Sequence, residues 1–140
     1  MIVYLDTSAL VKLFLDEPDT KVVADLLQDA SAVFTHMITY AETRAALSKA
    51  VRMKRITDET YLAYKAALEG YWKNIDVISL NMAHIRQAGA LAETYGLRGY
   101  DSVHLAAAKW LFEQSPTFTF ACFDQHLNQA ARTIGMRVLS

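Results

Sequence analysis

The chain opens with MIVYLDTSALVKLFL (residues 1–15), in which a strand pattern, an acid and a helix pattern follow one another without a loop. Ile2 to Leu5 is apolar and rich in β-forming residues, which predicts a buried strand. The next three residues are good helix N-caps, and Ala9 to Leu15 has the pattern of an amphipathic helix. In a parallel α/β sheet Asp6 then lies at the carboxyl end of a strand, where such folds bind ligands. Taken alone, Asp6 is explained equally well as a helix cap.

The composition predicts one globular domain spanning residues 1–140. The 140 residues are 53% hydrophobic and 21% charged, which suits a domain with a sizeable core. The net charge of −1 argues against indiscriminate nucleic-acid binding. Cys122 is the only cysteine, so the chain has neither a disulfide framework nor a cysteine zinc site. No signal-peptide pattern opens the chain and no apolar run approaches the length of a membrane span, so we expect a cytoplasmic protein without a membrane segment.

Strand and helix patterns alternate along the rest of the chain. Further strands are expected at 32–36, 76–80, 117–123 and 136–139, and helices at about 19–29, 38–54, 57–72, 81–95, 100–113 and 124–135. Such alternation predicts an α/β fold whose mostly parallel sheet has helices on both faces.

Four acids stand out in this pattern. Asp124 repeats the arrangement at Asp6, because an apolar strand ends directly in an acid that begins a helix. Asp101 is predicted to open another helix, whose dipole favours its ionised form. Glu42 differs, since it lies inside a helix beside small alanines that allow another element to approach closely. If strands one and four are neighbours at a topological switch point, Asp6 and Asp124 face each other.

Each acid also has a simpler explanation. Three of the four are helix caps, and Glu42 can be a solvated helix residue. Together, however, they predict a cluster of carboxylates, which persists when a cation holds it. Oxygen ligands without His or Cys partners suit Mg²⁺ or Mn²⁺ and the metal-assisted hydrolysis of phosphodiesters. With these four set aside as metal-bound, 14 basic residues face 11 acidic ones, so the remaining surface is mildly basic.

At these residues the chain resembles the PIN-domain ribonucleases, in particular the VapC-type toxins of toxin–antitoxin pairs. The resemblance is carried by LDTSALVK (5–12), YAETRA (40–45), YDSVHLAAA (100–108) and CFDQHL (122–127). Each motif is weak alone, but four in order over the whole chain are specific. The resemblance implies an α/β/α sandwich with strand order 3-2-1-4-5.

The resemblance also assigns roles to individual residues. It implies that Asp6, Glu42, Asp101 and Asp124 are the catalytic, metal-binding acids. Thr7 or Ser8 would supply a hydroxyl beside the metal. Many relatives have Thr where this chain has Cys122, a departure that leaves the acids in place but removes a polar contact near the phosphate.

The same resemblance implies an RNA substrate, a small antitoxin that blocks the site, and a homodimer. Two alternatives stay open: a PIN nuclease of RNA maturation or quality control without an antitoxin, and a module that binds RNA or protein without cleaving. Lys49 and Arg52 are interpreted either as a favourable helix C-terminus or as RNA backbone contacts. His104 is interpreted more readily as a packed core histidine than as a residue that orients Asp101.

Overall fold

A five-stranded parallel sheet forms the centre of the protein in the computed structural model, which describes residues 1–139. The strands are β1 (Ile2–Leu5), β2 (Ala32–His36), β3 (Asp76–Ile78), β4 (Phe118–Ala121) and β5 (Arg137–Val138). Their order is β3-β2-β1-β4-β5, and all four pairings are parallel. This confirms the expected order 3-2-1-4-5, with β1 and β4 side by side at the switch point.

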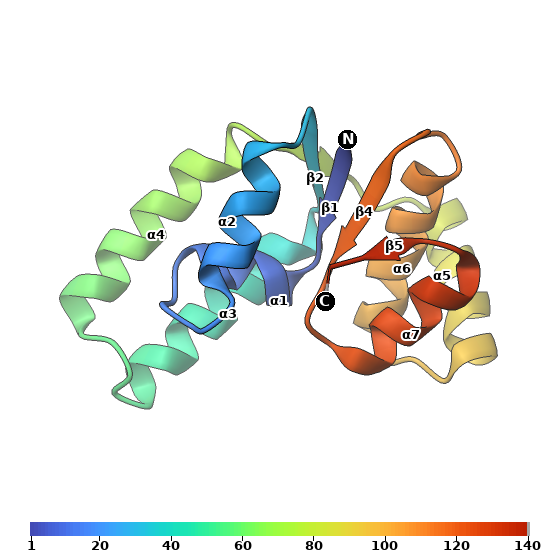
Figure 1. The fold of residues 1–140 in the computed structure, drawn as a ribbon. Coiled ribbons are helices and arrows are strands. Elements are labelled where there is room, and N and C mark those ends of the chain that lie inside the picture. The colour runs from blue at the N-terminus through green and yellow to red at the C-terminus, as the bar shows by residue number, and fades with distance from the viewer. Residues whose placement is uncertain (140) are drawn as a thin grey trace.

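Helices cover both faces of the sheet and complete the three expected layers. They are α1 (Thr7–Leu10), the 3₁₀-helix η1 (Val11–Leu13), α2 (Thr20–Gln28), α3 (Ile38–Arg52), α4 (Asp58–Trp72), α5 (Met82–Tyr95), α6 (Gly99–Phe112) and α7 (Gln125–Ile134). Figure 1 shows α1 to α4 on one side of the sheet and α5 to α7 on the other. None of the helices described within residues 1–139 is both long and apolar enough to cross a membrane.

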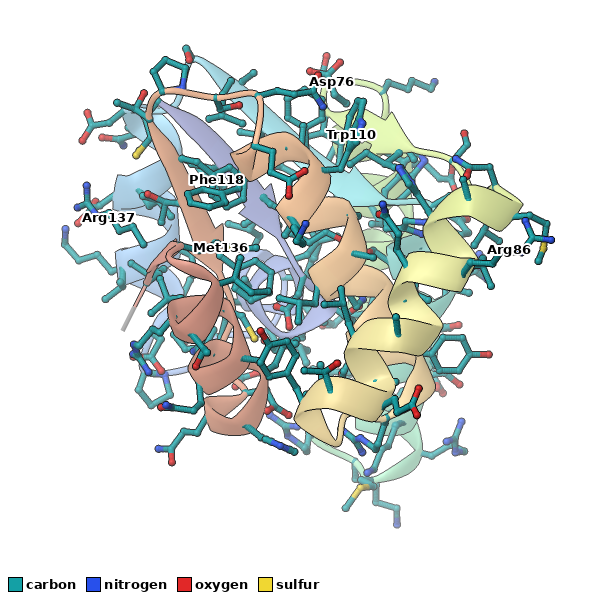
Figure 2. The ribbon with its side chains drawn as sticks, turned by 90° about the vertical axis from the view of Figure 1, so that its right-hand side faces the viewer. Asp76, Arg86, Trp110, Phe118, Met136 and Arg137 are labelled. Carbon is teal, nitrogen blue, oxygen red and sulfur yellow. The ribbon has the colours of Figure 1, made fainter. Side chains whose placement is uncertain are left out.

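Successive residues of the central strands feed two cores on opposite faces of the sheet. Val3 and Leu5 of β1 pack with α1, α2 and α4, whereas Tyr4 between them packs on the other face with α6 and α7. This is the two-residue period of a strand buried on both sides. Figure 2 looks onto the second face, with Phe118 and Met136 of that core near β4 and α7.

The first helix is shorter than its sequence pattern predicts. A single helix over Ala9–Leu15 was expected, but α1 ends at Leu10 and the chain tightens into η1. The tighter turn lets Leu10 pack on the sheet while Val11 and Leu15 pack against α3. The helix α6 also begins two residues before Asp101, which therefore lies in its first turn rather than at its first residue.

Candidate active site

The pairing of β1 with β4 places Asp6 beside the end of β4. Leu5 is in register with Ala121, and the Asp6 backbone N–H donates to the Ala121 carbonyl at 3.1 Å. Asp124 follows three residues later and caps α7, where its Oδ1 accepts from the Leu127 N–H at 2.9 Å. Both acids therefore lie at the carboxyl ends of neighbouring strands, as their sequence pattern predicts.

Asp6 is almost fully buried and is held in one orientation. Its Oδ1 accepts hydrogen bonds from the Ser8 hydroxyl at 2.7 Å and the Ala9 N–H at 3.0 Å. Burial raises the pKa of this carboxyl, and the positive character of His104 and the hydrogen bonds only partly oppose that rise. Ser8 also accepts from the Phe123 N–H at 2.8 Å, so it ties α1 to the end of β4.

Glu42 is positioned by two side chains from other elements. Its Oε1 accepts from the Thr7 hydroxyl at 2.6 Å and lies 2.7 Å from Nε2 of His104. Partial burial raises the pKa of Glu42, but these two hydrogen bonds and the charge of His104 outweigh it and leave the pKa below its ordinary value. Glu42 therefore holds its negative charge in place beside α1 and α6.

His104 in turn is fixed by the central strand. It is 2% exposed, and its Nδ1 lies 2.7 Å from the hydroxyl of Tyr4, a fully buried residue of β1. A carboxylate has no proton to donate, so the hydrogen between Glu42 and the ring belongs to Nε2. When the ring is neutral, Nδ1 accepts from the Tyr4 hydroxyl, and when the ring is protonated, Nδ1 donates to that oxygen. The pKa of Tyr4 is raised by burial and by the charges of Asp6 and Glu42.

The interpretation of His104 from sequence is thus half right. The residue is buried, as a packed core histidine would be, but it is not isolated. Its ring bonds to Glu42, which lies 62 residues away in the chain. Among the described residues, the hydrogen bonds of the ring go to Tyr4, Thr7 and Glu42 and not to Asp101. The sequence carries no signal for this pairing, because nothing in its spacing distinguishes His104 from its apolar neighbours.

Arg98 is a functional candidate that the sequence patterns do not reveal. It precedes the first residue of α6, and its Nε donates to Asp101 Oδ2 at 3.1 Å. A second nitrogen of the same guanidinium lies 3.8 Å from Asp124 Oδ2. The guanidinium therefore bridges two of the four acids, and its side chain is 82% exposed.

The four acids are held by three separate sets of contacts, of which the bond from Ser8 to Asp6 is one. Glu42 is joined to Thr7 and His104, while Asp101 and Asp124 share Arg98. Over the part of the chain that the structure describes, no three acidic, histidine or cysteine side chains stand close enough to enclose one metal ion.

The residues present nevertheless fit a hard divalent cation. The donors among these residues are carboxylate and hydroxyl oxygens, which Mg²⁺ and Mn²⁺ prefer. Asp6 is a buried carboxyl whose pKa is raised by burial, so a cation bound beside it would favour its ionised form. The contacts of Arg98 with Asp101 and Asp124 show that these two acids together attract a cation.

Two further predicted residues lie apart from these contacts. Lys49 and Arg52 are exposed on the last turn of α3, where Arg52 donates to the Ser48 hydroxyl at 2.7 Å. Their role in binding RNA stays a prediction. Cys122 keeps a polar role, because its Sγ accepts from the Asp124 N–H at 3.3 Å.

Comparison with known proteins identifies the family. The protein is a parallel α/β/α sandwich with acidic residues after its two neighbouring strands β1 and β4. A model of the PIN domain family matches residues 3–132, and the chain belongs to this family. It is 33% identical over 137 residues to Ribonuclease VapC49 of Mycobacterium tuberculosis, which covers 98% of this chain and 94% of that protein. It is 31% identical over 138 residues to Ribonuclease VapC35 of the same species, covering 99% and 96%.

Solved structures share the fold at lower sequence identity. FitAcB from Neisseria gonorrhoeae matches with a TM-score of 0.67 and 23% identity, over 100% of this chain and 97% of that chain. VapC20 of Mycobacterium tuberculosis, a toxin that cleaves the sarcin–ricin loop, matches with a TM-score of 0.69 and 17% identity, over 91% and 94%. These likenesses support the fold.

Proposed function

We propose that the protein is a metal-dependent endoribonuclease, working as one PIN domain, and the toxin of a toxin–antitoxin pair. One observation supports the proposal: Asp6 and Asp124 follow the neighbouring strands β1 and β4. Glu42 is bonded to Thr7, the neighbour of Asp6, and Asp101 shares Arg98 with Asp124. The relatives named Ribonuclease VapC support the activity, because they match this chain over nearly its whole length.

In this proposal the four acids hold one or two Mg²⁺ or Mn²⁺ ions at the carboxyl end of β1 and β4. The metal, when bound, supplies Lewis-acid polarisation of the scissile phosphate and lowers the pKa of the attacking water. Thr7 and His104 orient the Glu42 carboxylate, and Ser8 orients that of Asp6. Arg98, whose side chain is exposed, would turn from the acids toward a phosphate oxygen of the substrate.

The partners follow from the same proposal. One solved structure that shares this fold is a toxin–antitoxin complex from Klebsiella pneumoniae. We expect a small antitoxin that places an Arg or Lys against the acids, as Arg98 already does from within the chain. We also expect a homodimer, and a cytoplasmic location where RNA is available.

The experiment is cleavage of RNA by purified protein in Mg²⁺ or Mn²⁺ and in excess chelator. Asp6→Asn and Asp101→Asn should each reduce cleavage by at least about 100-fold, since even outer-shell partners of metal ligands are typically worth 10–100-fold. Circular dichroism should show both variants folded, because Asn keeps the shape of Asp. Asp25→Asn, at an exposed position of α2, is the matched control and should cleave normally. Full cleavage in excess chelator would refute the metal mechanism.

A growth assay separates the toxin from a housekeeping nuclease. Expression of the chain alone should arrest growth, and co-expression of its chromosomal neighbour should restore it. If the protein cleaves RNA in vitro but its expression does not slow growth in either condition, the toxin role would be refuted and the nuclease activity would stand.

A further inference from the structure

A hollow of about 600 Å³ adjoins the acids on one side. It is lined by residues of α5 and of the first turns of α6, together with Arg98 and with Glu42 of α3. Figure 2 shows α5 and α6 side by side across this face of the molecule. Glu42 and Asp101 line the hollow and also belong to the acidic site, so a molecule held in the hollow is held next to the reacting phosphate.

The side of the hollow formed by α5 is apolar, and most of its side chains are small. Ile85, Ala88, Gly89 and Ala92 recur at helical spacing and line one face of the helix. An ideal Cβ built at Gly89 meets no atom within 4 Å, so the hollow has free space above this residue. A wall of small apolar groups admits a flat, broad ligand and offers it few hydrogen bonds.

An exposed aromatic residue, Tyr100 of α6, also lines the hollow. Tyr100 is 66% exposed and directly precedes Asp101. An exposed aromatic ring beside a backbone-cleaving site is the kind of platform on which single-stranded bases stack. The charged residues that line the hollow, Glu42, Arg98 and Asp101, come from α3 and the start of α6, whereas the lining residues of α5 are all uncharged. The uncharged base is therefore the part of a nucleotide that fits against α5.

We propose that this hollow is a nucleobase subsite, which takes one unpaired base of the RNA next to the scissile phosphate. The proposal deepens the nuclease function given above and rests on it. The apolar residues of α5 would select a base by its size, because they offer no side-chain hydrogen bonds to its edge. A purine has the larger apolar face, so the subsite should favour a purine at one position flanking the cut.

The test uses two glycines as a matched pair. Gly89→Leu fills the hollow, whereas Gly70→Leu places the same side chain in open space on α4. Both changes replace a glycine within a helix by a better helix former, so neither should impair folding. The substrate is a randomised single-stranded oligoribonucleotide pool, and the cleavage positions are mapped by sequencing.

The wild type and Gly70→Leu should show a purine preference at one position beside the cut. Gly89→Leu should reduce that preference at least about fivefold, and the other positions should not change. Tyr100→Ala should weaken it in the same direction. A substrate with an abasic nucleotide at that position should be cut equally by wild type and Gly89→Leu, since neither then has a base to bind.

Three results would overturn the proposal. One is an unchanged preference in Gly89→Leu with normal cleavage. Another is a loss of cleavage in Gly89→Leu that is equally large on the abasic substrate. The third is a change in mass of Gly89→Leu by light scattering, which would assign the hollow to an interface between two copies of the chain. Failure of the wild type to cut any RNA would instead refute the nuclease function.

Discussion

A chain of hydrogen bonds links the central strand to one of the four acids. Tyr4 bonds to Nδ1 of His104, and Nε2 of His104 bonds to Glu42. Outer-shell partners of this kind fix the orientation of a metal ligand and are typically worth 10–100-fold in metal affinity or activity. His104 is thus a positioning residue for Glu42 in the proposed reaction.

We expect His104→Leu to weaken Mn²⁺ binding by about tenfold, because Glu42 loses a donor and becomes mobile. His104→Gln, whose side-chain amide can still donate from near the position of Nε2, should recover most of that loss. Isothermal titration with Mn²⁺ measures the affinity without relying on cleavage.

The comparison of the two His104 variants separates positioning from packing. Equal Mn²⁺ affinity in His104→Leu and wild type, with both folded, would show that His104 is only a core residue. Tyr4→Phe is a further check: it keeps the buried ring but removes the bond to Nδ1, and it should have a smaller effect in the same direction.

The junction of β2 with α3 contains a second buried histidine, His36. His36 is 1% exposed, and its Nδ1 accepts from the Ile38 N–H at 3.1 Å at the start of α3. Burial, with the positive charges of His104 and His84 and against the charge of Glu42, lowers the pKa of His36 from 6.5 to about 4.

The folded state therefore binds a proton at His36 more weakly than the unfolded state does. The free energy of unfolding should be unaffected by this group above about pH 6.5 and should fall as the pH drops toward 4, by up to about 3 kcal/mol. Urea unfolding of wild type and His36→Asn at several pH values measures the difference. Asn keeps an acceptor for Ile38 but does not titrate, so parallel pH profiles for the two proteins would contradict the prediction.

The starts of α6 and α7 are joined by Arg98. Its guanidinium contacts Asp101 and Asp124, where a divalent cation is proposed to bind. A fixed positive charge beside a cation site opposes the cation, although water screens an exposed group.

We expect Arg98→Met to bind Mn²⁺ roughly fivefold more tightly than wild type at low salt, because the competing charge is gone. Lys109→Met is the control: it removes one positive charge from the same helix, at a residue paired with Glu113 instead. If the Mn²⁺ affinity changes equally in both variants, the effect comes from the net charge of the protein and not from the position of Arg98.

At the scale of the whole molecule, metal binding should appear as thermal stability. A ligand that binds only the folded state stabilises it by about 2.7 kcal/mol at 100 times its Kd. Millimolar Mg²⁺ should therefore raise the Tm of the wild type by several degrees above its value in chelator. Asp101→Asn should gain much less. A wild-type Tm that is identical in chelator and in Mg²⁺ would argue against a resident metal.

The parallel sheet and its layers follow from local patterns in the sequence. The hydrophobic period of a strand is two residues and that of a helix is 3.6, so the two can be distinguished over a short stretch of sequence. Few topologies are compatible with strands and helices that alternate along the chain. The order of the strands came from the resemblance to PIN domains. Local patterns also indicated Asp6 and Asp124 as candidate site residues, because each directly follows an apolar stretch with the pattern of a strand. The limits of local patterns show at α1, which tertiary packing shortens.

The contacts that make the acids a site were decided only by the tertiary structure. His104 meets Glu42 across 62 residues and Tyr4 across 100, and Arg98 reaches Asp101 and Asp124 from the start of α6. Whether such groups touch depends on where helices pack on the sheet and on which rotamers the packing leaves open. Neither is encoded in the spacing of residues along the chain. The same holds for the hollow beside Gly89, since free space above a glycine exists only once neighbouring helices have taken their places.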